Sequence, residues 1–365
     1  MGEIKIKNIE TSSGFISLEK EWRILEKSLN HSNLTSSYDW LNTWWSVFKN
    51  VNNSLIGFNK KLIIICLYEN HNLVAIAPLL KVNRKKYGIN ISFIEFLGQQ
   101  WAGNYLDIIA GKSHIKYRNI IFKWLYNNVK FDSIFLKYIP NDTQCFTLDQ
   151  LYLYSACPEI NISEFRNYDE YVKNKYSKNL KQNLRTAYNK AKKADDMIET
   201  SIEALDHKNF KETVRLSEFK LLDRKNSIFN DENKSLFMQE VTKIMTSNVV
   251  FVHLNGKNVA YRTNVIFNNN KFCLDASYDR NFRKYELGSI SVDANLNDSF
   301  TNKMFSHCFG PGLDFYKKKF TKKNINIYMF IHKGNTFFSL IIFNIIKYLA
   351  KRKAASFNKE LLKYQ

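Results

Sequence analysis

A loop that joins basic side chains to a glycine is one of two segments whose residue types and spacing could do chemistry. The loop DRNFRKYELG, residues 279–288, lies between a predicted strand that ends near Tyr278 and a predicted helix that begins at Ser289. A helix N-terminus presents free N–H groups and partial positive charge, and a preceding glycine lets the backbone approach a pyrophosphate closely. The pattern therefore predicts a phosphate-binding loop, and the alternative is an ordinary helix with Ser289 as its N-cap. The candidate ligands are Arg283, Lys284, Gly288 and Ser289.

The second segment is GPGLDFYKKKF, residues 310–320. Gly310 and Gly312 bracket a proline, which predicts a tight turn. Tyr316 follows the turn at a fixed distance, and a phenol in such a place can act as general acid toward a leaving thiolate. Lys317 can hold a phosphate or a carboxylate as a point charge. The alternative interpretation is a turn followed by an exposed basic tail.

Two similar hairpin patterns indicate the elements that position these segments. ENHNLVAIAPLL, residues 69–80, and NGKNVAYRTNVIF, residues 255–267, look like the same hairpin in two copies of one unit. A repeat of this length indicates a duplicated domain rather than a solenoid. We therefore expect an α/β fold of two units with mainly antiparallel sheets, residues 1–160 and 161–335. A helical basic tail, residues 336–365, is expected to follow them.

The composition predicts a folded protein with an attraction for anions. Hydrophobic residues make up 45% of the 365 residues, which is enough for sizeable cores. The five cysteines form no CxxC pair, so a disulfide framework and a zinc ribbon are both disfavoured, and no metal is expected. The N-terminus shows no apolar signal core, which favours a cytoplasmic location. The net charge of +20 would attract phosphorylated ligands, nucleic acid or an anionic membrane, unless it reflects only a lysine-rich surface.

A long basic helix is predicted between the two units. From Tyr171 to Ala194 there is no acidic residue, and apolar side chains recur at helical spacing along the stretch. A helix face with only positive charge favours an anionic partner, and a solvated lysine face is the alternative. The predicted apolar face consists of Val172, Tyr176, Leu180, Leu184, Ala187, Tyr188 and Ala191.

The longest apolar run lies near the C-terminus. Residues 337–346 read FFSLIIFNII and are followed by basic residues up to Lys353. A helix that spans a bilayer needs about 20 apolar residues, so this run is too short. We favour a buried or partner-contacting helix. The alternative is peripheral contact of residues 337–353 with an anionic membrane, at its inner face.

Four segments together resemble a known family. They are SKNLKQNLRTAYNKAKK, NGKNVAYRTNVIF, LDASYDRNFRKYELGSI and FGPGLDFYKKKF. Their order and separation are similar to the CelD-like branch of the GNAT acetyltransferase superfamily, which is related to the Fem-type transferases built from tandem GNAT units. The resemblance implies two GNAT-like units, the second of which binds the acyl donor.

The resemblance carries specific expectations for single residues. It implies donor binding by Arg283, Gly288, Ser289 and the strand 259–264, and it places Tyr316 and Lys317 at the tyrosine–lysine pair that closes the family pattern. Leu287 stands where the family often has proline. Cys308 stands where the family often has aspartate, so Cys308 and His307 would have to substitute for that acid. A covalent acyl-cysteine at Cys308 is less expected than an inert buried thiol.

The chemistry implied by the resemblance is direct attack of an amine on a thioester. The expected donor is acetyl-CoA or another acyl-CoA, and the expected acceptor is an amine of an amino sugar or other cell-envelope polysaccharide precursor. A backbone N–H stabilises the oxyanion, and a base removes the amine proton. The alternatives are a Fem-like transferase that uses aminoacyl-tRNA, and a non-catalytic binder of polyanions or membrane surfaces. The candidate bases are Asp275, Asp279, Glu286 and His307.

Overall fold

The computed structural model describes residues 3–30, 33–86, 89–111, 114–143, 145–219 and 227–364. Two compact units divide the chain. The N-terminal unit comprises Met1–Ala156 with Ile325–Lys363, and the C-terminal unit comprises Cys157–Asn324.

The N-terminal unit is a mixed sheet with helices. The strand order is β1-β2-β3-β4-β6-β13, and β5 pairs with β3. Neighbours are antiparallel except for β4 and β6, which are parallel. The strands are β1 (Ile4–Ile9), β2 (Phe58–Glu69), β3 (Asn72–Lys86), β4 (Ile89–Phe96), β5 (Ile109–Ala110), β6 (Ser133–Pro140) and β13 (Asn324–Lys333). The helices are α1 (Ser12–Ser17), α2 (Glu19–Ser28), α3 (Tyr38–Phe48), α4 (His114–Asn128) and α11 (Ser339–Tyr364).

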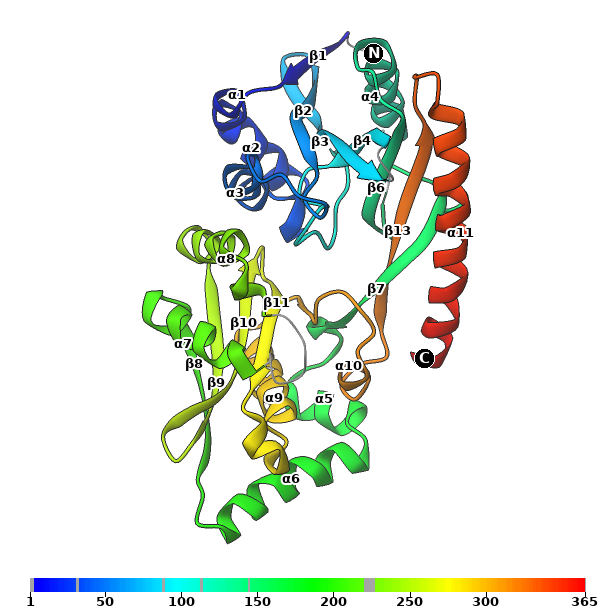
Figure 1. The fold of residues 1–365 in the computed structure, drawn as a ribbon. Helices are drawn as coiled ribbons and strands as arrows, with labels where there is room; N and C mark the ends of the chain where they lie inside the picture. The colour runs from blue at the N-terminus through cyan, green and yellow to red at the C-terminus, as the bar shows by residue number, and fades with distance from the viewer. Residues whose placement is uncertain are drawn as a thin grey trace. The chain divides into compact units, whose positions relative to one another are not determined.

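Helix α11 groups with the N-terminal unit instead of forming a separate tail. It runs alongside β13 (Figure 1), and Ala350 packs against Met329 and Ile331 of that strand. Strand β13 is itself hydrogen-bonded to β6. The sequence placed residues 325–335 in the second unit because they follow it directly, but strand pairing with β6 assigns them to the first. No helix in the described ranges is both long enough and apolar enough to cross a membrane.

The strands of the C-terminal unit are also mixed and mainly antiparallel, in the order β7-β12-β11-β10-β9-β8. Its strands are β7 (Leu151–Asn161), which enters from the first unit, β8 (Ile198–Ala204), β9 (Ser247–Leu254), β10 (Lys257–Phe267), β11 (Asn270–Tyr278) and β12 (Ser306–Cys308). Its α-helices are α5 (Tyr168–Lys175), α6 (Lys178–Lys193), α7 (His207–Ser217), α8 (Glu232–Ile244), α9 (Leu287–Thr301) and α10 (Phe315–Lys318). The expected two α/β units with mainly antiparallel sheets are therefore present.

The predicted hairpins form because asparagine accepts a left-handed backbone. The turn between β2 and β3 has φ of 49° at Asn70 and 64° at His71. The turn between β9 and β10 has φ of 52° at Asn255 and 76° at Gly256. Two successive residues with positive φ suit the tight turns that connect twisted antiparallel strands, and Asn and Gly tolerate them best.

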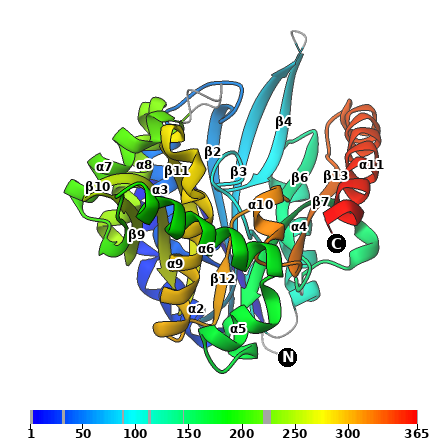
Figure 2. The same cartoon turned by 90° about the horizontal axis from the view of Figure 1, so that it is seen from below.

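The predicted basic helix is two helices. Tyr176 is extended (φ −74°, ψ 126°) and ends α5, and the Ser177 side chain accepts a hydrogen bond from the Leu180 N–H to cap α6. Helix α6 crosses α9 (Figure 2), and its Ala187 and Ala191 are buried in a cluster with Leu287 and Ile290 of α9. The prediction of one helix was wrong at the capping serine. Tyr188, predicted on the apolar face, is 43% exposed.

Candidate active site

A cavity of about 700 Å³ opens in the C-terminal unit where two parallel strands part. Strands β11 and β12 pair only from Asn270 to Phe272 and from Ser306 to Cys308. Beyond this point β12 ends, while β11 continues to Tyr278 paired with β10. Residues 273–278 line one side of the cavity, and residues 309–311 line another. The volume lies within the range of small-molecule sites, and the parted strand edge offers backbone groups to a ligand.

The start of helix α9 also faces this cavity. Leu287, Gly288 and Ser289 line it, and the helix begins at Leu287, two residues before the predicted start. Glu286 occupies the N-cap position with a left-handed backbone (φ 50°) and makes no capping hydrogen bond with its side chain. In the described ranges, the N–H groups of Leu287 and Gly288 have no hydrogen-bond partner. The cavity therefore has free donors and partial positive charge at one end.

Ser289 is not the N-cap that the sequence allowed. It is the third residue of α9, and its Oγ donates to Glu286 Oε2 at 3.1 Å. A Cβ added at Gly288 would meet the ring of Tyr278 at 3.6 Å, which is ordinary van der Waals contact. A methyl group therefore fits at this position without displacing a neighbour.

Basic side chains stand next to this helix start. Arg280 and Arg283 line the cavity from the short helix η6 (Arg280–Tyr285) that precedes α9. Lys284 lies outside the lining, and its ammonium group stands 4.7 Å from the ring centroid of Tyr285. Of the predicted phosphate ligands, the structure brings together Arg283, Gly288 and Ser289, and leaves Lys284 aside.

Lys317 lines the cavity, but its ammonium group is bound to the neighbouring turn. Its Nζ donates to the carbonyl oxygens of Gly310, Pro311 and Gly312 at 3.1, 3.0 and 3.0 Å. The side chain is 3% exposed, and Asp314 lies 3.1 Å away. An ammonium group has three hydrogens, and the three carbonyls take all of them. Lys317, which the sequence predicted as a point charge for a phosphate, therefore holds the GPG turn instead. The two glycines of this turn have φ of 77° and 95°.

Arg262, which is buried, and Tyr316, which is exposed, contact each other in the same cavity. The guanidinium carbon of Arg262 lies 5.6 Å from the ring centroid of Tyr316. Arg262 also contacts the Cys273 thiol. Burial acts to lower the pKa of Arg262, but its contacts with Tyr316 and Cys273 outweigh that effect and the pKa is raised, so the group is cationic. Tyr316 is 36% exposed, which leaves its hydroxyl group within reach of a ligand.

His307 lies in a buried polar cluster and not in the cavity lining. Its Nδ1 is 2.8 Å from Ser299 Oγ and its Nε2 is 3.3 Å from Cys273 Sγ. Burial, with the charges of Lys271 and Arg262, holds the pKa of His307 well below its ordinary value. The neighbouring Cys308 lies 3.1 Å, sulfur to sulfur, from Cys157, and this contact and burial raise the pKa of the Cys308 thiol. These positions do not favour His307 or Cys308 as a replacement for the family aspartate.

The acidic candidates have different surroundings. Asp279 caps η6 by accepting a hydrogen bond from the Asn281 N–H at 3.0 Å, and it is outside the lining. Glu286 lines the cavity beside Lys319, at 3.9 Å. Asp275 lines the cavity from β11 and accepts a hydrogen bond from the Tyr261 hydroxyl at 2.5 Å.

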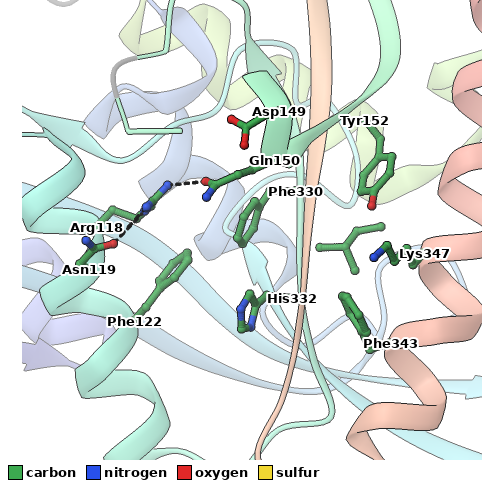
Figure 3. A pocket seen from close by; sticks show the side chains of 11 residues that line it. Arg118, Asn119, Phe122, Asp149, Gln150, Tyr152, Phe330, His332, Phe343 and Lys347 are labelled. Atoms are coloured by element: carbon green, nitrogen blue, oxygen red, sulfur yellow. Dashed lines mark hydrogen bonds between the residues drawn. The ribbon is translucent and has the colours of Figure 1, made fainter. Parts of the chain in front are cut away.

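The N-terminal unit has a smaller cavity of about 320 Å³. Figure 3 shows Arg118 turned toward Asn119 and Gln150, to which it donates at 3.0 and 2.9 Å. Phe122, Phe330 and Phe343 supply apolar walls. No lining residue is among the described buried polar atoms that lack a partner, so nothing in this cavity demands a ligand.

Arg262 is the main cavity residue that the sequence analysis did not single out, although it lies within the strand 259–264. Its Nε is a buried atom without a hydrogen-bond partner in the described part of the chain, and the residue lines the cavity of the C-terminal unit. The signal was available in the sequence: Arg262 is a cation in the middle of a strand whose neighbouring residues predict burial. A buried charge requires a partner.

Comparisons with known proteins agree with this architecture. Residues 178–318 match the family model described as an acetyltransferase (GNAT) domain. No curated protein sequence matches the chain. The chain is similar to a conserved protein of unknown function from Bacteroides thetaiotaomicron VPI-5482, with 10% identity and a TM-score of 0.54 over 91% of this chain and 100% of that one. It is also similar to FemX, with 12% identity and a TM-score of 0.54 over 84% of this chain and 88% of that one. Residues 178–318 are thus similar to a GNAT domain, and most of the chain shares the fold of FemX.

Proposed function

We propose that this GNAT-superfamily protein is an acyl-CoA-dependent N-acyltransferase of the CelD-like branch, and that the cavity of its C-terminal unit binds the acyl donor. One observation carries the proposal: a parted strand edge and a helix start with free N–H groups line the same cavity as two exposed arginines. Phosphate groups suit the helix start, and an extended amide-containing chain suits the strand edge.

The proposed roles follow from the position of each group. Arg283, the N–H groups of Leu287 and Gly288, and the dipole of α9 hold the phosphates of the donor. A backbone N–H on the unpaired edge of β11 stabilises the oxyanion that forms when the amine attacks the thioester carbon. The carbon–sulfur bond then breaks, and Tyr316 donates a proton to the departing thiolate.

The base that accepts the amine proton is proposed among the acids of the lining. Asp275 and Glu286 both line the cavity. Glu286 stands at the phosphate end, whereas Asp275 belongs to the strand edge along which the thioester would lie. We therefore expect Asp275→Asn to lower turnover by about 100-fold and Glu286→Gln to lower it far less. If the Asp275→Asn and Glu286→Gln variants have the same turnover as each other, Asp275 is not the base.

Calorimetric titration with coenzyme A tests the donor site. The wild-type protein is expected to bind coenzyme A, and Gly288→Glu is expected to bind it at least about tenfold more weakly, because the new carboxylate faces the phosphates. Gly288→Ala is the matched control, since its Cβ meets only the Tyr278 ring at 3.6 Å. Absence of coenzyme A binding to the wild-type protein would contradict the proposal.

A second candidate function is favoured by one feature. The exposed surface of α6 carries Lys178, Lys181, Arg185, Lys190, Lys192 and Lys193, and the helix contains no acid. A nucleic acid could bind this surface, as an aminoacyl-tRNA donor would. Titration with tRNA over a range of salt concentrations separates the two donors, because phosphate contacts give a steep salt dependence.

The acceptor is proposed to be an amine of an amino sugar or another cell-envelope precursor.

A further inference from the structure

We propose that Arg262 is the recognition residue for a carboxylate that one of the substrates carries into the reaction end of the cavity. This inference rests on the proposed function, because it names a chemical feature of the substrates of the same site. The observation behind it is that the Arg262 side chain lines the cavity, is 5% exposed, and has an Nε without a hydrogen-bond partner.

The surroundings of Arg262 contain no compensating charge. It lies in β10 opposite Ala276 of β11, within a run of buried residues. Its contacts are the Tyr316 phenol and the Cys273 thiol, neither of which is a carboxylate. In the described part of the chain, no carboxylate lies within ion-pair distance of this guanidinium.

Two other buried cations of the C-terminal unit lie beside a carboxylate. Lys271, in the neighbouring strand β11, pairs with Asp298. Lys317 gives its donors to three carbonyls and lies beside Asp314. Among the buried cations that the structure describes in the C-terminal unit, Arg262 is therefore the one without a carboxylate beside it, and it faces the cavity.

A carboxylate would satisfy this group completely. The guanidinium is a planar fork whose parallel N–H groups match the two oxygens of a carboxylate, and its Nε–H is free to form one of the two bonds. Leaving a buried donor and a buried charge without partners destabilises the protein. Such a group is commonly retained at a binding site, where the ligand supplies the partner.

This position is distinct from the phosphate end. Gly288 lies next to Tyr278, at the end of β11, whereas Arg262 contacts Cys273, where β11 leaves β12. Cys273 and Tyr278 are five positions apart along the strand, which corresponds to about 16 Å. One phosphate group cannot bridge that distance. The anion at Arg262 is therefore a second anion, beside the proposed proton donor Tyr316.

Two sources could supply this carboxylate, and two pairs of probes distinguish them. The acyl group of the donor supplies it if succinyl-CoA binds more tightly than acetyl-CoA in calorimetric titration. The acceptor supplies it if a mixture of the twenty common amino acids raises the melting temperature while a mixture of their amides does not. The second measurement needs no coenzyme A, so it remains informative if the donor proposal fails.

The variants Arg262→Met and Arg262→Lys are measured with both pairs of probes. In the wild-type protein, the carboxylate member of at least one pair is expected to be preferred by about tenfold or more. Arg262→Met should remove the preference, and Arg262→Lys should retain part of it. A wild-type protein that prefers neither carboxylate probe, or a preference that survives Arg262→Met, overturns the inference.

The melting temperature without ligand gives an independent control. Because an uncompensated buried charge is unfavourable, Arg262→Met should melt at the same temperature as the wild-type protein or at a higher one. Coenzyme A binding should be retained, since its phosphates bind at the other end. A melting temperature lowered by many degrees would show that Arg262 is structural and would also overturn the inference.

Discussion

Replacing Lys317 by methionine separates the two interpretations of this residue. If Lys317 is a clamp, the variant loses stability, because three carbonyls of the GPG turn lose their donor. If Lys317 binds a phosphate, as its place in the sequence suggested, the variant loses donor affinity and keeps its stability.

The expected loss follows from the exposure of the three acceptors. The Gly310 carbonyl is buried in this contact, so its loss of a partner costs about 1–3 kcal/mol. The Pro311 and Gly312 contacts are partly buried, so water can replace the ammonium group there and each loss costs about 0.5–1 kcal/mol. The Asp314 side chain is 61% exposed, and its ion pair adds little. The total is about 3 kcal/mol, which lowers the melting temperature by roughly 6–12 °C in a unit of this size.

Differential scanning calorimetry measures this change, and Lys319→Met is the matched control. Lys319 lies on the same short segment, is 3.9 Å from Glu286 and is partly exposed, so its variant should stay within about 1 kcal/mol of the wild-type protein. A Lys317→Met variant that melts like the wild-type protein and binds coenzyme A at least about tenfold more weakly would refute the clamp.

Three further predictions address chemistry, pH and surface. Tyr316→Phe should lower turnover by about 100-fold with an unchanged melting temperature, because a proton donor is lost from a partly exposed side chain; unchanged turnover would exclude the role. The pKa of His307 in the folded state is far below its unfolded value of about 6.5, so the unfolded state binds the extra proton. The free energy of unfolding should therefore fall as the pH drops below about 6.5, by up to about 1.4 kcal/mol per pH unit. His307→Gln should remove that slope in urea unfolding between about pH 5 and 6.5, and a slope that persists would assign it to other groups. We also propose that the exposed Phe337, Phe338 and Ile341 bind anionic membranes, so that the wild-type protein should sediment with phosphatidylglycerol vesicles and a triple serine variant should not; a wild-type protein that stays in the supernatant would refute this.

The hairpins and the helix start that lines the cavity were predictable because their signals are local. Asn70 and Asn255 lie at turns where two successive residues need a left-handed backbone, and this requirement is visible in a few neighbouring residues. Gly288 at a helix start with arginine nearby is a pattern of the same kind. The sequence misplaced the first residue of α9 by two positions, since Glu286 takes the N-cap place without a capping side chain.

The sequence by itself determined the fold class and the GNAT resemblance, and it predicted a phosphate-binding loop at residues 279–288, because each depends on short-range patterns. Only the tertiary structure decided what the charged groups contact. Lys317 turns back onto carbonyls five to seven residues earlier, His307 is enclosed by Ser299 and Cys273, and Arg262 is buried without a counter-charge. The partner and the burial of a charge are set by segments that the folded chain brings together, and no local pattern carries that information.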